Sequence, residues 1–124
     1  MPDRPTIEIP PDQTPSVELQ LEDLEVGGSE VAQKGQTVEV HYVGTSWSSG
    51  KEFDASWNRG STFKFKLGMG QVIAGWDEGV TGMKVGGRRR ITIPPHLGYG
   101  KRGAGGVIGP DETLVFVVDL VSVQ

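Results

Sequence analysis

Cysteine is absent from this chain of 124 residues, and its absence excludes disulfides, thiolate catalysis and cysteine-bound zinc. Histidine is scarce as well, because His41 and His96 are the only two and neither has a partner at metal-ligand spacing. No G-x-S-x-G turn is present to hold a serine nucleophile. The sequence therefore predicts neither a metal nor a cofactor, and it argues against nucleophilic hydrolysis.

Long apolar runs and a strong net charge are missing too. No stretch approaches the roughly 18 apolar residues that cross a bilayer, and residues 1–14 lack the apolar run of a secretory signal. The formal net charge of -4 gives no reason to expect nucleic acid or an anionic membrane as a partner. The run Arg88–Arg90 is interpreted as a solvated strand end, because no aromatic residue interleaves it. We expect a cytoplasmic protein.

Glycine, by contrast, is abundant, and proline is concentrated near the N-terminus. The 19 glycines are about twice the average usage of ~7%, which favours tight turns and β architecture. Residues 1–16 hold five of the eight prolines among charged and polar groups, and such a segment is typical of a disordered tail. We expect a single domain over residues 17–124, and we expect that removing the tail leaves its stability unchanged.

Alternating apolar residues predict several strands. The clearest alternation places Phe63, Phe65 and Leu67 on one face and lysines on the other. Similar alternation marks segments 17–21, 38–42, 91–93 and 113–123. The last of these segments is apolar on both faces, which is typical of a central strand.

One short helix is expected between these strands. Ile73, Trp76 and Val80 have the spacing of a single helical face. Three glycines fall on a neighbouring stripe: Gly75, Gly79 and Gly82. Because each glycine costs a helix roughly 1 kcal/mol, their presence indicates a helix packed too closely on a sheet for side chains to fit. The predicted fold class is α+β, with an antiparallel sheet curled around this helix.

Six aromatic residues come from separate segments: Tyr42, Phe53, Phe63, Trp76, Tyr99 and Phe116. Composition alone leaves two interpretations open, an ordinary core or the lining of a pocket. Residues 98–103 match the bare dinucleotide pattern, but the glycines and the proline that follow forbid the helix that would bind a pyrophosphate. That segment is interpreted as a glycine-rich loop.

Six segments, taken in order, resemble the signatures of the FKBP family of peptidyl-prolyl cis/trans isomerases. They are Val40–Gly44, Phe53–Ser56, Phe63–Gly68, Gln71–Val80, Gly98–Gly100 and Thr113–Phe116. The match runs from about residue 19 to the C-terminus. The resemblance implies a monomeric rotamase that assists protein folding by rotating Xaa-Pro peptide bonds. Its partners would be proline-containing polypeptides and macrolide ligands such as tacrolimus and rapamycin.

The resemblance also implies a set of site residues. The implied catalytic residues are Tyr42, Phe53, Asp54, Trp76, Tyr99 and Phe116. The implied substrate- and ligand-binding residues are Arg59, Phe63, Val72, Ile73 and Ile108. Trp76 would form the pocket floor, and the Ile73 backbone N–H and the Tyr99 hydroxyl would bind ligand carbonyls. Asp54 would join a polar network with Tyr42 and Arg59.

Three departures from the family pattern bear on specificity. Residues 101–110 would form a flap that brings Ile108 over the pocket, and Ala104 stands there where family members often have a histidine. Gln71 replaces an acidic residue that is common in animal proteins. The loop around Trp47 is one residue longer than usual. These differences leave the family assignment intact and concern contacts at the rim of the pocket.

Overall fold

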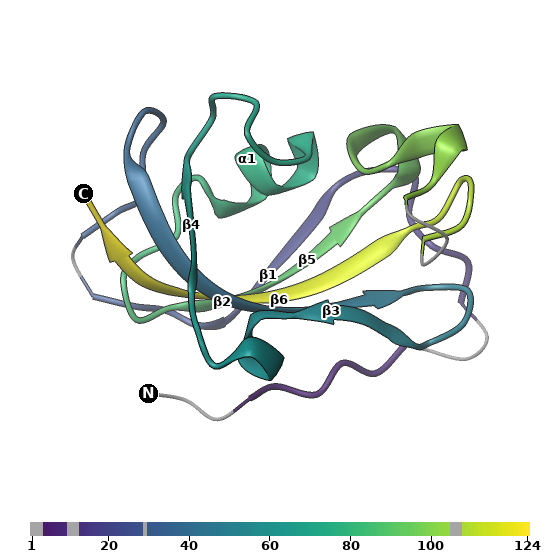
Figure 1. Cartoon of the computed structure of the whole chain (residues 1–124), viewed down its shortest axis with the longest axis horizontal. Helices are drawn as coiled ribbons and strands as arrows, with labels where there is room; N and C mark the ends of the chain where they lie inside the picture. The colour runs from purple at the N-terminus through teal and green to yellow at the C-terminus, as the bar shows by residue number, and fades with distance from the viewer. Residues whose placement is uncertain (1–3, 10–12, 29, 105–107) are drawn as a thin grey trace.

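The computed structural model describes residues 4–9, 13–28, 30–104 and 108–124, which form a six-stranded antiparallel sheet curled around one helix (Figure 1). The strands are β1 (Gln20–Glu25), β2 (Thr37–Ser46), β3 (Glu52–Ala55), β4 (Phe63–Lys66), β5 (Arg88–Ile93) and β6 (Leu114–Val123). Their order is β1-β5-β6-β2-β3, and β4 also pairs with β2. The helix α1 spans Ala74–Val80. The predicted α+β architecture is confirmed.

The 3-10 turns η1 (Ser56–Arg59), η2 (Pro95–Leu97) and η3 (Gly100–Arg102) connect these elements. Within the described ranges, no helix has both the length and the apolar character needed to cross a membrane.

Helix α1 lies very close to the inner face of the sheet. A Cβ atom on Gly75 would stand 2.5 Å from Ile93 Cγ2, and one on Gly79 would stand 2.9 Å from Ile91 Cγ2. Real side-chain atoms do not approach so closely, so glycine is required at both positions. Gly82 is different, because it follows the end of the helix with a φ of 91°, and a Cβ atom there would have no other atom within 4 Å. The predicted glycine stripe is therefore correct for two of its three members.

The main core fills the space between α1 and the sheet. Its members come from every strand except β1 and β3, and from the helix: Val38, Val40, Phe65, Leu67, Trp76, Val80, Ile91, Ile93, Leu114, Phe116, Val118 and Leu120 are all buried. The predicted central position of β6 is confirmed, because it lies between β5 and β2. Burial on both of its faces explains the apolar residues on both.

The first strand differs from its prediction in position and burial. Alternation placed it at residues 17–21, but β1 begins at Gln20 and Val17 is 81% exposed. All six residues of β1 are exposed. The reason is its place at the sheet edge, where it pairs only with β5 and has a register shift after Asp23. Only Leu19, just before the strand, packs against the core.

The proline-rich N-terminal segment crosses the outer face of the sheet (Figure 1). Arg4 forms an ion pair with Glu52 on β3, Pro5 is buried, and the backbone carbonyl of Glu8 accepts a hydrogen bond of 3.1 Å from Arg90 on β5. Strands β6 and β2 lie between these two strands. The contacts of residues 4–8 therefore span the outer face from β3 to β5.

The outer face that this segment crosses carries a row of small apolar side chains, and we infer that the segment covers part of this row. Val43 pairs with Val117 on β6 and with Ala55 on β3, and Val117 pairs with Arg90 on β5. These residues alternate with core residues, so their side chains point to the outer face, yet Val43 and Val117 are each only 2% exposed. The disorder expected for residues 1–16 stays a prediction, but the described contacts change the expected effect of removing them.

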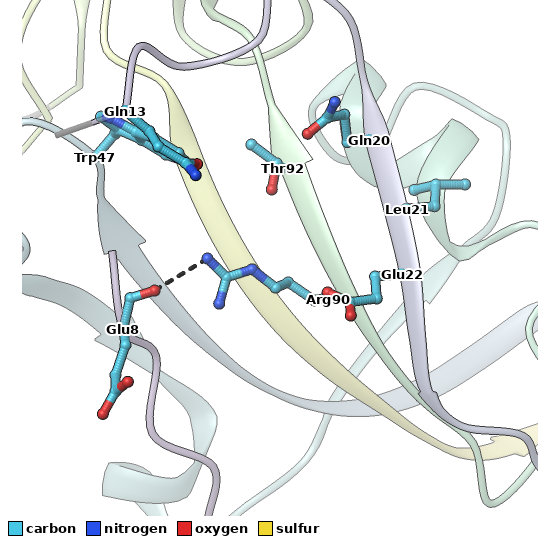
Figure 2. Close-up of a pocket in the computed structure, with 8 residues that line it drawn as sticks. All are labelled: Glu8, Gln13, Gln20, Leu21, Glu22, Trp47, Arg90 and Thr92. Carbon is cyan, nitrogen blue, oxygen red and sulfur yellow. Dashed lines mark hydrogen bonds between the residues drawn. The ribbon is translucent and has the colours of Figure 1, made fainter. Parts of the chain in front are cut away.

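A polar hollow of about 670 Å³ remains beside this crossing. It is lined by Glu8, Gln13, Gln20, Leu21, Glu22, Trp47, Arg90 and Thr92. Figure 2 shows Arg90 reaching from β5 across the hollow to the Glu8 carbonyl. The hollow is open and lies on the face of the sheet away from α1, so none of the predicted site residues lines it.

Deleting residues 1–9 is expected to destabilise the domain, because Val43 and Val117 lose part of their cover. Uncovering two valines in part costs about 1 kcal/mol, which lowers Tm by roughly 5 °C for a domain of this size. Thermal unfolding followed by circular dichroism measures the change. The control is Arg4→Gln, which removes only an exposed ion pair and should shift Tm by about 1 °C or less. An unchanged Tm in the deletion variant would show that the crossing contributes nothing to stability.

Candidate active site

A pocket of about 220 Å³ opens between α1 and the inner face of the sheet. It is lined by Tyr42, Phe53, Asp54, Phe63, Gln71, Val72, Ile73, Trp76, Tyr99 and Phe116. All the site residues expected from the sequence line it except Arg59 and Ile108. They come from β2, β3, β4, β6, α1 and the loops before α1 and η3. The fold thus brings together side chains that are up to 74 positions apart, from residue 42 to residue 116.

Trp76 lies at the bottom of this pocket, on α1, with 4% of its surface exposed. Its ring packs edge to face against Tyr42 at 4.9 Å and against Phe116 at 5.2 Å between centroids. Its buried indole N–H has no hydrogen-bond partner among the described residues, and aromatic rings surround it. Edge-to-face packing of this kind fixes ring orientations. The result is an apolar floor made of rings that pack directly against one another.

Gly44 on β2 makes room for two of the pocket walls. A Cβ atom at this position would stand 2.6 Å from Phe116 Cε1 and 2.7 Å from Phe53 Cζ. The two phenylalanine rings meet directly over it, 5.5 Å apart and nearly perpendicular at 88°. Sequence reasoning placed Gly44 inside a family signature but gave it no role. The absence of a side chain is what brings these rings into contact.

A polar network closes one side of the pocket. The Tyr42 hydroxyl donates a hydrogen bond of 2.5 Å to Asp54 Oδ2. Arg59 Nη1 donates to Asp54 Oδ1, and Arg59 Nη2 donates to the Tyr42 hydroxyl oxygen, both at 2.8 Å. Arg59 does not line the pocket, but it holds both of its partners from the rim. The network expected from the resemblance is present in the structure.

The two acidic groups of this network have oppositely shifted pKa values. Burial, and then the hydrogen bond to Asp54, raises the pKa of Tyr42. Burial alone would raise the pKa of Asp54 too, but the hydrogen bonds from Tyr42 and Arg59 together outweigh it and lower that pKa. Asp54 is therefore a carboxylate and Tyr42 a neutral donor near neutral pH. The network can orient groups, and it does not exchange protons in that range.

Two further predicted residues stand at the mouth of the pocket. Ile73 is the residue before α1, with an extended ψ of 151°, so its backbone N–H lies outside the helical hydrogen-bond ladder. Tyr99 precedes η3 and is 41% exposed. Both residues line the pocket, so each brings a polar group beside an apolar cavity.

Backbone pairing holds the two described residues that flank the tip of the predicted flap. Ala104 and Ile108 exchange two backbone hydrogen bonds, of 2.8 and 3.0 Å. Ile108 is 6% exposed and belongs to the core, and it does not line the pocket. Residues 105–107, at the tip of the predicted flap, lie outside the described residues.

Two polar side chains, without a role in the sequence-based prediction, fasten the loop between β4 and α1. Gln71 lines the pocket and accepts a hydrogen bond of 2.8 Å from the Lys66 backbone N–H. Asp77 on α1 accepts bonds from the Gly68 and Gly70 backbone N–H groups, at 2.8 and 3.0 Å. Both side chains link the loop to its flanking elements. Gln71, which stands where an acidic residue is common in animal proteins, thus has a structural contact with β4.

Comparison with known proteins agrees with this geometry. A family model described as FKBP-type peptidyl-prolyl cis-trans isomerase matches residues 28–121. The chain belongs to this family. As an FKBP-type protein it is a peptidyl-prolyl cis-trans isomerase, and the resemblance drawn from the sequence is confirmed.

Similar FKBP relatives cover nearly the whole chain. An FK506-binding protein of Streptomyces anulatus is 58% identical over 122 residues, which are 98% of this chain and 98% of that protein. A probable FK506-binding protein of Corynebacterium glutamicum is 48% identical over 120 residues, 97% of this chain and 98% of the relative. The crystal structure of AtFKBP13 superposes with a TM-score of 0.79 at 40% identity, covering 86% of this chain and 93% of that one.

Replacing Gly44 by alanine is expected to damage the FKBP pocket more than the fold. The added methyl group would push Phe53 and Phe116 apart, at a cost of roughly 1–3 kcal/mol for overpacking. Misplaced pocket walls should lower kcat/KM for prolyl isomerisation by about ten- to hundred-fold. Both quantities are measurable on the purified variant, by urea unfolding and by an isomerisation assay.

The matched control for this change is Gly28→Ala. There the nearest atom to a new Cβ is the Val85 carbonyl oxygen at 3.7 Å, an ordinary contact, so activity should remain at the wild-type level. Full activity in Gly44→Ala would mean that contact between the two rings is not needed.

Proposed function

We propose that the Trp76 pocket is where this enzyme rotates Xaa-Pro peptide bonds. The observation that carries the proposal is the convergence of aromatic side chains from five elements and one loop around one apolar floor, with a polar network on one side. Within the described residues, no three His, Cys, Asp or Glu side chains are placed to hold a metal ion.

The chemistry of prolyl rotation suits such a pocket. The barrier of ~18–20 kcal/mol comes from amide resonance. The planar amide is strongly polarised and well solvated by water, whereas the twisted transition state has lost resonance and is less polar. Transfer into an apolar site therefore costs the ground state more than the transition state, and that difference lowers the barrier. A thousand- to million-fold acceleration requires about 4–8 kcal/mol.

Hydrogen bonds at the mouth would hold the substrate while one half of it turns. The Ile73 backbone N–H and the Tyr99 hydroxyl are the groups that we assign to substrate carbonyls. Tyr42, Asp54 and Arg59 keep the polar wall fixed, so that little reorganisation accompanies the turn. No covalent bond forms and no proton moves between enzyme and substrate.

Proline-containing polypeptides are the proposed substrates, and assistance of protein folding is the proposed role. The cytoplasmic location and the monomeric state stay predictions from the sequence.

A protease-free isomerisation assay on short peptides tests this function, with Leu, Phe, Ala or Glu before the proline. Faster turnover is expected for Leu and Phe, because Phe53, Phe63 and Phe116 offer apolar contact at ~25 cal/mol per Å² buried. Equal rates for Leu and Glu would contradict apolar recognition. Binding of the peptides without acceleration would show instead that the pocket serves a binding module.

We further propose that macrolides such as tacrolimus and rapamycin occupy the same pocket. The similar proteins from Streptomyces and Corynebacterium are named as binding FK506. A ligand that mimics the twisted prolyl amide should bind more tightly than a substrate peptide. Its ring would rest on the indole of Trp76.

Tryptophan fluorescence on macrolide binding tests this placement. Of the three tryptophans, Trp47 lines the polar hollow on the outer face and Trp57 stacks on His41, with ring centroids 4.2 Å apart. Only Trp76 lines the pocket. The variant Trp76→Phe should keep weaker binding by calorimetry and lose most of the ligand-dependent change in fluorescence. If the full change persists in Trp76→Phe, another tryptophan senses the ligand and the floor is misassigned.

A further inference from the structure

The edge of β2 changes its partner next to the pocket. Residues 37–40 of β2 pair with β4, and residues 43–45 pair with β3. His41 and Tyr42 fall between these two pairings, where neither strand supplies a backbone partner. A backbone N–H that is buried without a partner is costly, so another group has to fill the gap.

The side chain of Ser56 fills it. Ser56 is fully buried, with 0% of its surface exposed, and the Tyr42 backbone N–H donates a hydrogen bond of 2.7 Å to its Oγ. The same Oγ lies 2.8 Å from His41 Nδ1 and 3.4 Å from the Tyr42 carbonyl oxygen. The hydroxyl proton has a well-placed acceptor in His41 Nδ1 when that nitrogen is unprotonated. One buried hydroxyl thus replaces a ladder contact of the sheet.

This contact and the polar network of the pocket hold the same tyrosine at both ends. Ser56 begins the η1 turn, and Arg59 ends it. The Tyr42 backbone is bonded to the first residue of the turn, and the Tyr42 hydroxyl is bonded to the last. Strand β2 and the turn therefore form a closed loop of interactions, and the position of the Arg59 guanidinium depends on both links.

We propose that Ser56 is a positioning residue for the isomerase site, an inference that rests on the proposed function. Its hydroxyl fixes the η1 turn against β2, so that Arg59 stays in place to align Asp54 and Tyr42. Ser56 lines no part of the pocket among the residues described, and it touches no substrate. It acts through the turn.

The outer face supports the same turn from behind. The His41 ring stacks on Trp57, the residue after Ser56, with an interplanar angle of 18°. Since His41 and Tyr42 are neighbours in a strand, their side chains point to opposite faces. Two consecutive residues of β2 therefore contact the turn from opposite faces. His41 stacks on Trp57 on the outer face, and Tyr42 is bonded to Arg59 on the inner face.

A double-mutant cycle on the full-length protein tests the proposal, with kcat/KM measured on a Leu-Pro peptide. Ser56→Ala should lower kcat/KM by about three- to ten-fold, the range expected when one hydrogen bond is lost. Tyr42→Phe removes the hydroxyl that Arg59 grips. In the Tyr42→Phe protein, adding Ser56→Ala should lower kcat/KM little further, because the aligned network that Ser56 supports is already disrupted. If the fold-losses in kcat/KM of the two single variants multiply in the double variant, the two residues act independently and the proposal is overturned.

Ser46→Ala is the matched control. Ser46 is the last residue of β2 and is 4% exposed, so the change also deletes a buried serine hydroxyl, and kcat/KM should remain at the wild-type level. If Ser46→Ala lowers kcat/KM as much as Ser56→Ala does, the loss in Ser56→Ala reflects general destabilisation, which contradicts the positioning role. Urea unfolding of both variants confirms that the assay is run on folded protein.

If Ser56→Ala does not fold, Ser56→Cys takes its place in the cycle. A thiol keeps the volume of the side chain closely and is a weak hydrogen-bond acceptor, so a smaller loss with the same coupling to Tyr42→Phe is expected. Wild-type activity in a folded Ser56→Cys or Ser56→Ala variant would contradict the positioning role and leave the proposed function intact. An inactive wild-type protein would instead contradict the proposed function itself.

Discussion

The close contact between α1 and the sheet is the constraint on which the rest of the structure depends. A helix of seven residues is far too short to be stable in isolation, so its conformation comes from packing. That packing requires the bare α-carbons of Gly75 and Gly79 against Ile93 and Ile91. It sets the depth at which Trp76 enters the ring cluster. A helix displaced by the width of a methyl group would lift the indole away from Tyr42 and Phe116 and open the floor.

The sheet separates two kinds of environment, and strand alternation links them. On the inner face, aromatic rings form the pocket. On the outer face, Val43 and Val117 are buried and His41 stacks on Trp57. Tyr42 belongs to the inner set while its neighbours belong to the outer one. A change on the outer face can therefore reach the site through the backbone of β2. The Ser56 hydroxyl is bonded to that backbone at Tyr42, which gives the proposed positioning role its physical basis.

Much of the fold and nearly all of the pocket could be predicted from the sequence. The strand periodicities, the helix and the family signatures each specify local structure, and the pocket follows once the signatures are aligned in order. What escaped prediction depends on distances across the fold. Gly44 is one of 19 glycines, and nothing local shows that two rings meet over it. Ile108 was expected at the pocket; it is buried among the core residues and is not one of the residues that line the pocket.

The contacts of the N-terminal segment were not predicted for another reason. Its contacts use a backbone carbonyl, a proline ring and an exposed ion pair, none of which leaves a periodic pattern in the sequence. Composition therefore indicated a tail without packing partners. The start of β1 was similarly missed, because an edge strand with both faces exposed does not need the alternation that was used to find it.

The central claim is that prolyl rotation takes place on the Trp76 floor. Exchange NMR on a Leu-Pro peptide with a catalytic amount of protein measures rotation, and the indole N–H resonances of the three tryptophans, recorded at higher peptide concentration, report where the peptide lies. The account predicts exchange between the cis and trans peptide signals only when protein is present, with a shift of the Trp76 indole resonance while those of Trp47 and Trp57 stay in place. Catalysed exchange with an unmoved Trp76 resonance would contradict it.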